Sequence, residues 1–427
     1  NRSGFFVNID KNNFSYLVRP SRLTGEVFIS GAKNSVLRLL AATLLTSEDI
    51  HLLNYPEGLL DAQVHEQMLN VLGKECTASD GKIVIQESER LTSLLRWDGR
   101  SIRNTLLILG ALTARTGEGR VPLPGGCNLG ERKYDLHEML LRRLGADVWE
   151  EDGYLCASAP QGLTGADIHL PMRSTGATEN AILCGSLASG ITRVWNPHIR
   201  PEILDLIRFL RSMGAKIQVF GQEHIEITGV EELRGSSYSI LPDNMEALTW
   251  LVAAVITGGS IEIHNFPYRD LEVPLIHLRE SGARFFRGAD SLIVRGGCCY
   301  PLEISTGPYP GINSDMQPLL AVYAAFARGQ SVIVDLRFPG RYGYAEELAK
   351  MGMCYQVGDN LLRIEGGTPL NGANVRALDL RAGIALTLAG LGTVGGETLI
   401  HDAWQVERGY NRFVEKLQSL GGDINYV

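Results

Sequence analysis

The chain contains an internal repeat with a period of about 70 residues. Each copy has an amphipathic helix pattern that ends in an apolar residue, a glycine and a strand pattern, as in "MLNVLGKEC" and "LLRRLGADV". Glycine suits the position after a helix, because the backbone there often adopts a positive φ. The glycines of the six copies are Gly73, Gly145, Gly214, Gly282, Gly352 and Gly421. A period of this length accommodates one αβ unit, so the sequence predicts six related units.

A second element recurs half a period away from these glycines. It is a strongly apolar helix pattern headed by a polar turn, as in "SIRNTLLILGALTA" and "LPDNMEALTWLVAAVI". A helix that is apolar on nearly all sides is buried. Each unit should therefore combine one buried helix, one amphipathic surface helix and several strands. We expect an α/β fold in which six units form two domains of three.

Composition excludes several classes of function. The net charge of −8 argues against non-specific binding to nucleic acid, which needs a basic surface. The sequence has no apolar window long enough to span a membrane, and its opening residues lack the apolar core of a signal peptide. The seven cysteines are odd in number and follow no metal-binding spacing. We therefore expect a cytoplasmic protein with reduced thiols and with neither nucleic acid nor membrane partners.

The polar turns at the starts of the buried helices carry charged residues. Lys33, Arg103 and Arg173 occupy matching positions in the first three units. Helix N-termini present free N–H groups and a partial positive charge, so these cations would add to an anion-binding field. The matching turns of the last three units contain Glu246, Asp315 and Asp379. The sequence thus predicts an anion site with carboxylates opposite it.

One stretch rich in proline and glycine contains a cysteine. It reads "RVPLPGGCNLGERKYDLH", and its composition favours a mobile loop around Cys127. Arg132 follows the thiol, and a cation close to a thiol lowers its pKa. Arg341 and Arg408 lie in other polar stretches. Arginine suits carboxylate and phosphate because its guanidinium group can bind two oxygens at once.

Six motifs then follow one another in a recognisable order: "GAKNS", "LPGGCNLGERKYDLH", "STGAT", "SDMQ", "DLRAG" and "ERGY". Together they resemble the UDP-N-acetylglucosamine 1-carboxyvinyltransferase family, which is related to 5-enolpyruvylshikimate-3-phosphate synthase. The resemblance covers essentially the whole chain. It implies two inside-out α/β barrels, each of three units around buried parallel helices. The first would be residues 33–241 with the mobile loop 120–133, the second residues 1–32 and 242–427, with the active site in the cleft between them.

The resemblance also implies a reaction without a metal or an organic cofactor. The enolpyruvyl group of phosphoenolpyruvate would move to the 3-hydroxyl of a UDP-sugar through a tetrahedral intermediate, with release of phosphate. This is the first committed step of peptidoglycan synthesis. The catalytic residues implied are Cys127, Asp315, Lys33 and Arg408. Cys127 would assist protonation of the methylene group, and Asp315 would orient or deprotonate the sugar hydroxyl.

Binding residues carry over in the same way. The implied ligands of phosphoenolpyruvate are Lys33, Arg103, Arg132, Arg341, Arg381 and Arg408. The implied ligands of the acceptor are Asn34, Arg132, Asp135, Leu136, Arg173, Ser174, Thr175, Gly176, Asp315 and Phe338, with Asp379 and Glu246 in support. The cysteine loop would act as a lid that closes over the substrates and excludes water.

Some positions depart from the family pattern. Met172 stands where the family usually has a cation, and Asn244 stands where it usually has an arginine. Both border the implied nucleotide-sugar site. They leave open that the acceptor is a different uridine nucleotide or nucleotide-sugar of specialised metabolism. A non-catalytic paralogue is a further alternative, against which the retention of Lys33, Cys127 and Asp315 speaks.

Overall fold

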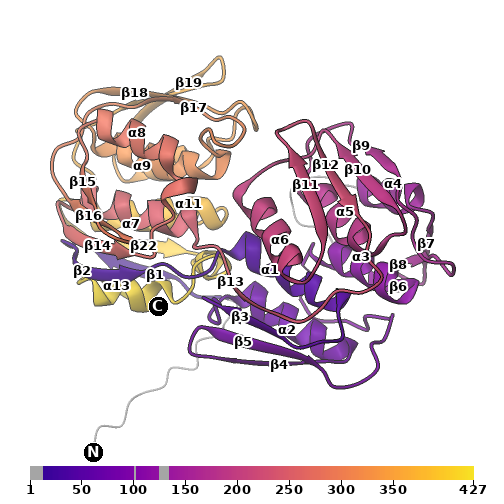
Figure 1. Cartoon of the computed structure of the whole chain (residues 1–427). Helices are drawn as coiled ribbons and strands as arrows, with labels where there is room; N and C mark the ends of the chain where they lie inside the picture. The colour runs from indigo at the N-terminus through magenta and orange to yellow at the C-terminus, as the bar shows by residue number, and fades with distance from the viewer. Residues whose placement is uncertain (1–12, 101, 125–133) are drawn as a thin grey trace, which may run out of the picture. The chain divides into compact units, whose positions relative to one another are not determined.

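The computed structural model in Figure 1 describes residues 13–100, 102–124 and 134–427 of an α/β protein. The chain divides into two compact units. The first unit is Gly31–Leu241, and the second unit combines Pro242–Val427 with the start of the chain up to Ser30. Within the described residues, no helix has the length and apolar character needed to cross a membrane.

The first unit contains six helices and three sheets within its described residues. Its strands are β3 (Ile50–Leu53), β4 (Lys74–Ser79), β5 (Lys82–Glu87), β6 (Glu118–Pro122), β7 (Asp147–Glu151), β8 (Tyr154–Ser158), β9 (Asp167–His169), β10 (Ile191–Trp195), β11 (Lys216–Phe220), β12 (His224–Thr228) and β13 (Ser236–Ser239). The sheet orders are β13-β3-β5-β4, β6-β8-β7 and β11-β12-β10-β9. Its helices are α1 (Lys33–Ala42), α2 (Leu60–Leu72), α3 (Thr105–Thr116), α4 (Asp135–Arg143), α5 (Thr175–Leu187) and α6 (Pro201–Ser212).

The second unit repeats this architecture. Its strands are β1 (Tyr16–Arg19), β2 (Thr24–Phe28), β14 (Ser260–His264), β15 (Arg284–Arg287), β16 (Ser291–Arg295), β17 (Glu303–Ser305), β18 (Gln330–Val334), β19 (Cys354–Gly358), β20 (Leu361–Glu365), β21 (Asn374–Arg376), β22 (Thr398–His401) and β23 (Asp423–Tyr426). They form sheets of order β21-β22-β1-β23, β15-β16-β14-β2 and β17-β18-β20-β19. Its helices are α7 (Asn244–Ile256), α8 (Glu272–Glu280), α9 (Gln317–Phe326), α10 (Tyr344–Lys350), α11 (Leu380–Leu391), α12 (Trp404–Glu407) and α13 (Phe413–Ser419).

Five of the six sheets formed by the described residues share one pattern of strand pairing. The strand that follows the apolar helix pairs in parallel with an edge strand and antiparallel with the next strand of the sheet, as β14 does with β2 and β16. In the sheet of β6, a parallel bridge between Leu94 and Arg120 takes the place of the edge strand. The start of the chain completes the second unit, because β1 pairs with β22 and β23.

The apolar helices form the interior of each unit. In α7 every residue from Asn244 to Val255 is buried, and α7, α9 and α11 pack against one another. In the first unit, α3 packs against both α1 and α5. The predicted burial of these helices is confirmed.

The glycines that follow the outer helices have the predicted backbone conformation. Gly73, Gly214 and Gly352 have φ values of 110°, 103° and 108°, and the other three glycines of the repeat also have positive φ. An L-residue with a side chain rarely adopts this conformation. The glycines therefore end each helix and turn the chain into the next strand.

The expected boundary of the cysteine loop was wrong at its start. Arg120 and Val121 belong to β6, because Val121 is fully buried and pairs with Leu155 of β8. The strand ends at Pro122. Cys127 and Arg132 lie outside the described residues, so their expected positions stay predictions.

A buried histidine of α2 predicts a pH dependence of stability. His65 is fully buried, and neither ring nitrogen has a hydrogen-bond partner among the described residues. Burial lowers the pKa of His65 to about 3. The unfolded state then binds a proton more readily than the folded state, so stability is lost as the pH falls below the unfolded pKa of about 6.5.

We expect His65→Leu to reduce this loss. Between pH 7 and pH 5 the parent protein should lose about 2 kcal/mol more unfolding free energy than the variant, as the linkage relation requires. Urea denaturation at the two pH values measures the difference. Equal losses in both proteins would show that His65 is not held neutral in the folded state.

Candidate active site

Lys33 is the first residue of α1 and forms an ion pair in the first unit. Its Nζ lies 3.0 Å from Oδ2 of Asp61, which is in the first turn of α2. The side chain of Asp61 is almost completely buried, whereas that of Lys33 is partly exposed. A buried carboxylate fixes the direction of the lysine, so the ammonium group is held at the helix N-terminus where an anion would bind. Sequence reasoning missed Asp61.

Asp61→Asn should therefore lower the catalytic efficiency with an anionic substrate that Lys33 binds. For phosphoenolpyruvate, the anionic donor that the sequence resemblance implies, we expect kcat/KM to fall about tenfold, because a hydrogen bond between charged groups contributes about 1.5–3 kcal/mol and part of it remains with the amide. Steady-state kinetics with varied phosphoenolpyruvate measure the change. Asp80→Asn, in an exposed turn of the same unit where Asn fits the positive φ, is the control. Equal kinetics in both variants would contradict a role for the Asp61 carboxylate.

The N-terminus of α5 gathers four predicted acceptor ligands. Ser174 caps the helix, since its Oγ accepts a hydrogen bond of 3.3 Å from the backbone N–H of Ala177. Thr175 Oγ1 lies 2.8 Å from Nδ1 of His198, and Arg173 Nε donates to Asn196 at 3.3 Å. Gly176 follows in the first turn. The arrangement orients hydroxyl groups and one guanidinium group around a helix end that favours anions.

The remaining predicted residues of the first unit lie on three helices or next to them. Arg103 is exposed in the turn before α3, and its charge contributes to lowering the pKa of the buried His137. Asn34 is half-buried in α1. Asp135 and Leu136 form the first turn of α4, which packs against α5. The structure thus brings the predicted uridine end, at α4, next to the predicted diphosphate turn, at α5.

In the second unit the predicted carboxylates are paired with a predicted arginine. Arg341 Nη1 donates to Oδ1 of Asp315 at 3.2 Å, and Arg341 Nη2 lies 3.9 Å from Oδ2 of Asp379. Asp379 also caps α11, because it accepts a hydrogen bond of 2.7 Å from the N–H of Ala382. The guanidinium carbon of Arg341 lies 5.5 Å from the ring centre of Phe338. Four predicted residues therefore form one cluster.

Arg381 joins this cluster from α11 and is largely buried. Burial alone would lower its pKa, but the negative charge of Asp315, together with Tyr410 and Asp243, outweighs burial and raises the pKa of Arg381. Tyr410 is itself held by Thr249, whose hydroxyl lies 2.7 Å from the phenol oxygen. The guanidinium group is therefore permanently charged and fixed in place. Sequence reasoning missed Tyr410, because nothing in the spacing of the chain links it to Arg381.

Glu246 and Arg408 complete the predicted set. Glu246 is buried in the first turn of α7 and pairs with Lys416 of α13. It also accepts a hydrogen bond of 3.3 Å from the N–H of Ser30, so it joins the start of the chain to the helix. Arg408 follows α12 directly. The supporting role expected of Glu246 stays a prediction, and the structure shows that Lys416 is its partner.

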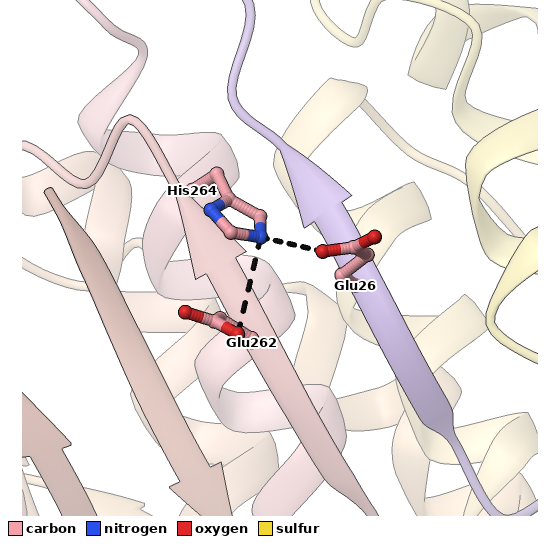
Figure 2. Close-up of side chains that lie close together, drawn as sticks. All are labelled: Glu26, Glu262 and His264. Atoms are coloured by element: carbon pink, nitrogen blue, oxygen red, sulfur yellow. Dashed lines mark hydrogen bonds and ion pairs between the residues drawn. The ribbon is translucent and has the colours of Figure 1, made fainter. Parts of the chain in front are cut away.

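A separate cluster lies on the sheet of β14 (Figure 2). Glu26, Glu262 and His264 form the one group of three potential metal ligands within the described residues. His264 Nε2 lies 2.7 Å from Glu26 Oε2, and Ser291 donates to Glu262 at 2.6 Å. Figure 2 shows the two glutamates on adjacent strands, both directed at the imidazole. These hydrogen bonds account for the cluster as a polar surface group.

Comparison with known proteins agrees with these observations. The family EPSP synthase (3-phosphoshikimate 1-carboxyvinyltransferase) matches residues 17–417. A UDP-N-acetylglucosamine 1-carboxyvinyltransferase 2 of Carboxydothermus hydrogenoformans is 40% identical over 95% of this chain and 97% of its own length. A UDP-N-acetylglucosamine 1-carboxyvinyltransferase of Caulobacter vibrioides is 36% identical over 96% and 97%.

A solved structure is similar over the same extent. The enolpyruvyl transferase NikO from Streptomyces tendae superposes with a TM-score of 0.86 at 28% identity, and the match covers 97% of this chain and 99% of that one. An EPSP synthase from Acinetobacter baumannii shares the fold with a TM-score of 0.79 at 22% identity. The chain is therefore an enzyme of the EPSP synthase family of enolpyruvyl transferases and belongs, within it, to the UDP-N-acetylglucosamine 1-carboxyvinyltransferases.

Proposed function

We propose that this enzyme transfers the enolpyruvyl group of phosphoenolpyruvate to the 3-hydroxyl of UDP-N-acetylglucosamine and releases phosphate. This would be the first committed step of peptidoglycan synthesis. The observation that carries the proposal is the nearly full-length match, at 36% to 40% identity, to enzymes of that name. The charged groups of both units, described above, support it, because the donor is a polyanion and the acceptor carries a diphosphate.

The predicted cations provide the binding groups for phosphoenolpyruvate. Lys33, held by Asp61, and Arg103 would bind its phosphate together with Arg408, whereas Arg341 and Arg381 would bind its carboxylate. The fixed charge of Arg381 supports this assignment, since a preorganised donor needs no reorganisation when negative charge develops. Its rigid fork also matches the two oxygens of a carboxylate.

Asp315 would act on the sugar hydroxyl. In the addition step its carboxylate accepts the hydroxyl proton while the oxygen attacks C2 of phosphoenolpyruvate, and C3 takes a proton from the thiol of Cys127. In the elimination step the thiolate of Cys127 takes a proton back from C3, the double bond re-forms, and the bond from C2 to the phosphate oxygen breaks. The proton held by Asp315 passes to the departing phosphate, which restores both residues. Arg341, whose Nη1 lies 3.2 Å from Oδ1 of Asp315, orients this carboxylate for the first step. The roles of Cys127 and Arg132 follow from the resemblance alone.

The acceptor would bind chiefly through the first unit. Ser174, Thr175, Gly176 and Arg173 surround a helix N-terminus suited to a diphosphate. Asn34 would contact the sugar, and Asp135 and Leu136, on the adjacent helix, would contact the uridine. Phe338 of the second unit would lie near the sugar ring. We propose that the acceptor-binding residues and the phosphoenolpyruvate-binding residues hold the two substrates of a single reaction.

We also propose that each unit is an inside-out α/β barrel. Support comes from the three apolar helices of the second unit, which pack against one another, and from the sheets that follow each of them. In such a barrel the helices form the core and the sheets form the outer layer. All three helix N-termini of a unit would then lie at one end, which explains why the polar turns collect charged residues.

The test of the proposed function is the choice of acceptor. Phosphate release from phosphoenolpyruvate should be measured with UDP-N-acetylglucosamine, UDP-glucose, UMP and 3-phosphoshikimate. We expect efficient turnover with UDP-N-acetylglucosamine and little with the others. Turnover only with another uridine nucleotide would contradict the proposal and would mean that Met172 and Asn244 redefine the acceptor pocket.

A further inference from the structure

His137 of α4 is a buried residue for which the reaction described above has no use. The residue is only 7% exposed, and its ring contacts α5. Its Nδ1 is 3.0 Å from Nδ2 of Asn180, a fully buried residue of α5. Buried polar groups are nearly always hydrogen-bonded, so one atom of this pair must donate and the other must accept.

The partners of Asn180 settle which ring nitrogen carries the proton. The amide nitrogen donates to the backbone carbonyl of Leu106 at 3.1 Å, which fixes the orientation of the amide group. Its second hydrogen therefore points to Nδ1 of His137, and Nδ1 must accept. Burial, together with the charge of Arg103, lowers the pKa of His137 to about 4. The imidazole is therefore neutral, and its single proton is on Nε2.

The Nε2–H group has no hydrogen-bond partner among the residues that the structure describes. The Nε2 edge of the ring lies against the first turn of α5, where a Cβ atom placed on Gly176 would lie 3.2 Å from Nε2 and 3.3 Å from Cε1. Gly176 allows this approach because it has no side chain. The edge of a largely buried imidazole is thus next to a helix N-terminus whose own N–H groups favour an anion.

We propose that His137 donates a hydrogen bond from Nε2 to a phosphate oxygen of the nucleotide-sugar at the N-terminus of α5, and that Asn180 fixes the tautomer that makes this possible. The proposal rests on the proposed function and adds one binding residue and one positioning residue to it. A neutral donor suits this place, because Arg103 already supplies positive charge and a second cation beside it would be disfavoured. The ligand class is a diphosphate ester of a nucleoside.

The test compares His137→Leu with His137→Gln in the full-length protein. Leucine removes the donor and glutamine keeps an N–H group. Calorimetry should show that His137→Leu weakens UDP binding about ten- to hundredfold, as expected for loss of a hydrogen bond to a charged group, and that His137→Gln recovers most of the affinity. Uridine, which lacks phosphate, should bind both variants and the parent equally when titrated at high concentration by NMR. His65→Leu, at a buried histidine of the same unit, is the matched control and should bind UDP like the parent.

Two further readouts separate binding from structural support. In kinetics, His137→Leu should raise KM for UDP-N-acetylglucosamine by the same factor while KM for phosphoenolpyruvate stays unchanged. Nitrogen-15 NMR of the labelled histidine rings should show His137 in the Nε2–H form, with a shift at Nε2 when UDP is added.

A further variant is Gly176→Ala, which presses a methyl group against the ring. It should also weaken UDP binding without affecting the binding of uridine.

Equal UDP affinity in His137→Leu and the parent would overturn the proposal, as would an equal loss of uridine and UDP affinity or an Nδ1–H tautomer. These results can occur in a parent protein that turns over UDP-N-acetylglucosamine normally, and they would then leave the proposed function intact. A parent protein that binds no UDP would overturn both.

Discussion

Asp315→Asn should lower kcat by about 10²–10⁴-fold, which is the usual contribution of a positioned general base. The substitution keeps the shape of the side chain and its contact with Arg341, but it removes the group that accepts the hydroxyl proton. It also removes a negative charge that acts on Arg381. Because the substrates are still bound by the cations, KM for either substrate should change by less than about tenfold. Steady-state phosphate release with both substrates varied gives these numbers.

Asp402→Asn provides a matched control in the same unit. Asp402 also pairs with an arginine, Arg376, and its side chain is 29% exposed, against 28% for Asp315. Asparagine tolerates the positive φ of this position. The control should keep kcat near that of the parent protein. An Asp315→Asn enzyme with unchanged kcat and a raised KM would make Asp315 a binding residue and would contradict its proposed role.

Arg381→Lys should lower kcat/KM for phosphoenolpyruvate by about 10²–10³-fold, equivalent to about 2.7–4 kcal/mol of transition-state stabilisation. Lysine keeps the charge but loses the planar fork that binds two carboxylate oxygens. The position is largely buried and surrounded by Asp315, Asp243 and Tyr410, so a lysine there leaves hydrogen-bonding groups without their partner. The loss should appear mainly in the dependence on phosphoenolpyruvate.

Arg376→Lys is the corresponding control, since Arg376 forms an exposed ion pair with Asp402. Exposed pairs contribute little to stability, so this variant should remain close to the parent in activity and in unfolding free energy. Thermal unfolding of Arg381→Lys should be checked alongside the kinetics. If a folded Arg381→Lys protein used phosphoenolpyruvate as well as the parent, Arg381 would not be a ligand of that substrate.

The repeat made much of the fold predictable from the sequence. The glycines at the helix ends and the apolar helices depend on local patterns, and both have the predicted geometry in all six units, as Gly73 and α7 illustrate. The polar turns were predictable from local sequence too, because a charged residue directly before a long apolar stretch is easily recognised. The start of the cysteine loop was misplaced because the pairing of Val121 with Leu155 depends on a strand more than 30 residues away.

The partners of the site residues could not be predicted. Lys33 pairs with Asp61 of the next helix, Glu246 with Lys416 of a distant one, and Arg381 with Tyr410. These pairs depend on how helices and loops pack, which a repeat period does not specify. His137 is the last residue of the cysteine motif, but the role proposed for it depends on the hydrogen bond from Asn180, which lies on a different helix.

The most direct test of the account is to identify the product. Phosphoenolpyruvate and UDP-N-acetylglucosamine should be incubated with the enzyme, and the nucleotide-sugar then analysed by mass spectrometry and NMR while phosphate is counted. The account predicts one enolpyruvyl ether at the 3-oxygen of the sugar for each phosphate released. Phosphate released without a modified sugar, or an enolpyruvyl group at another position or on another acceptor, would contradict it.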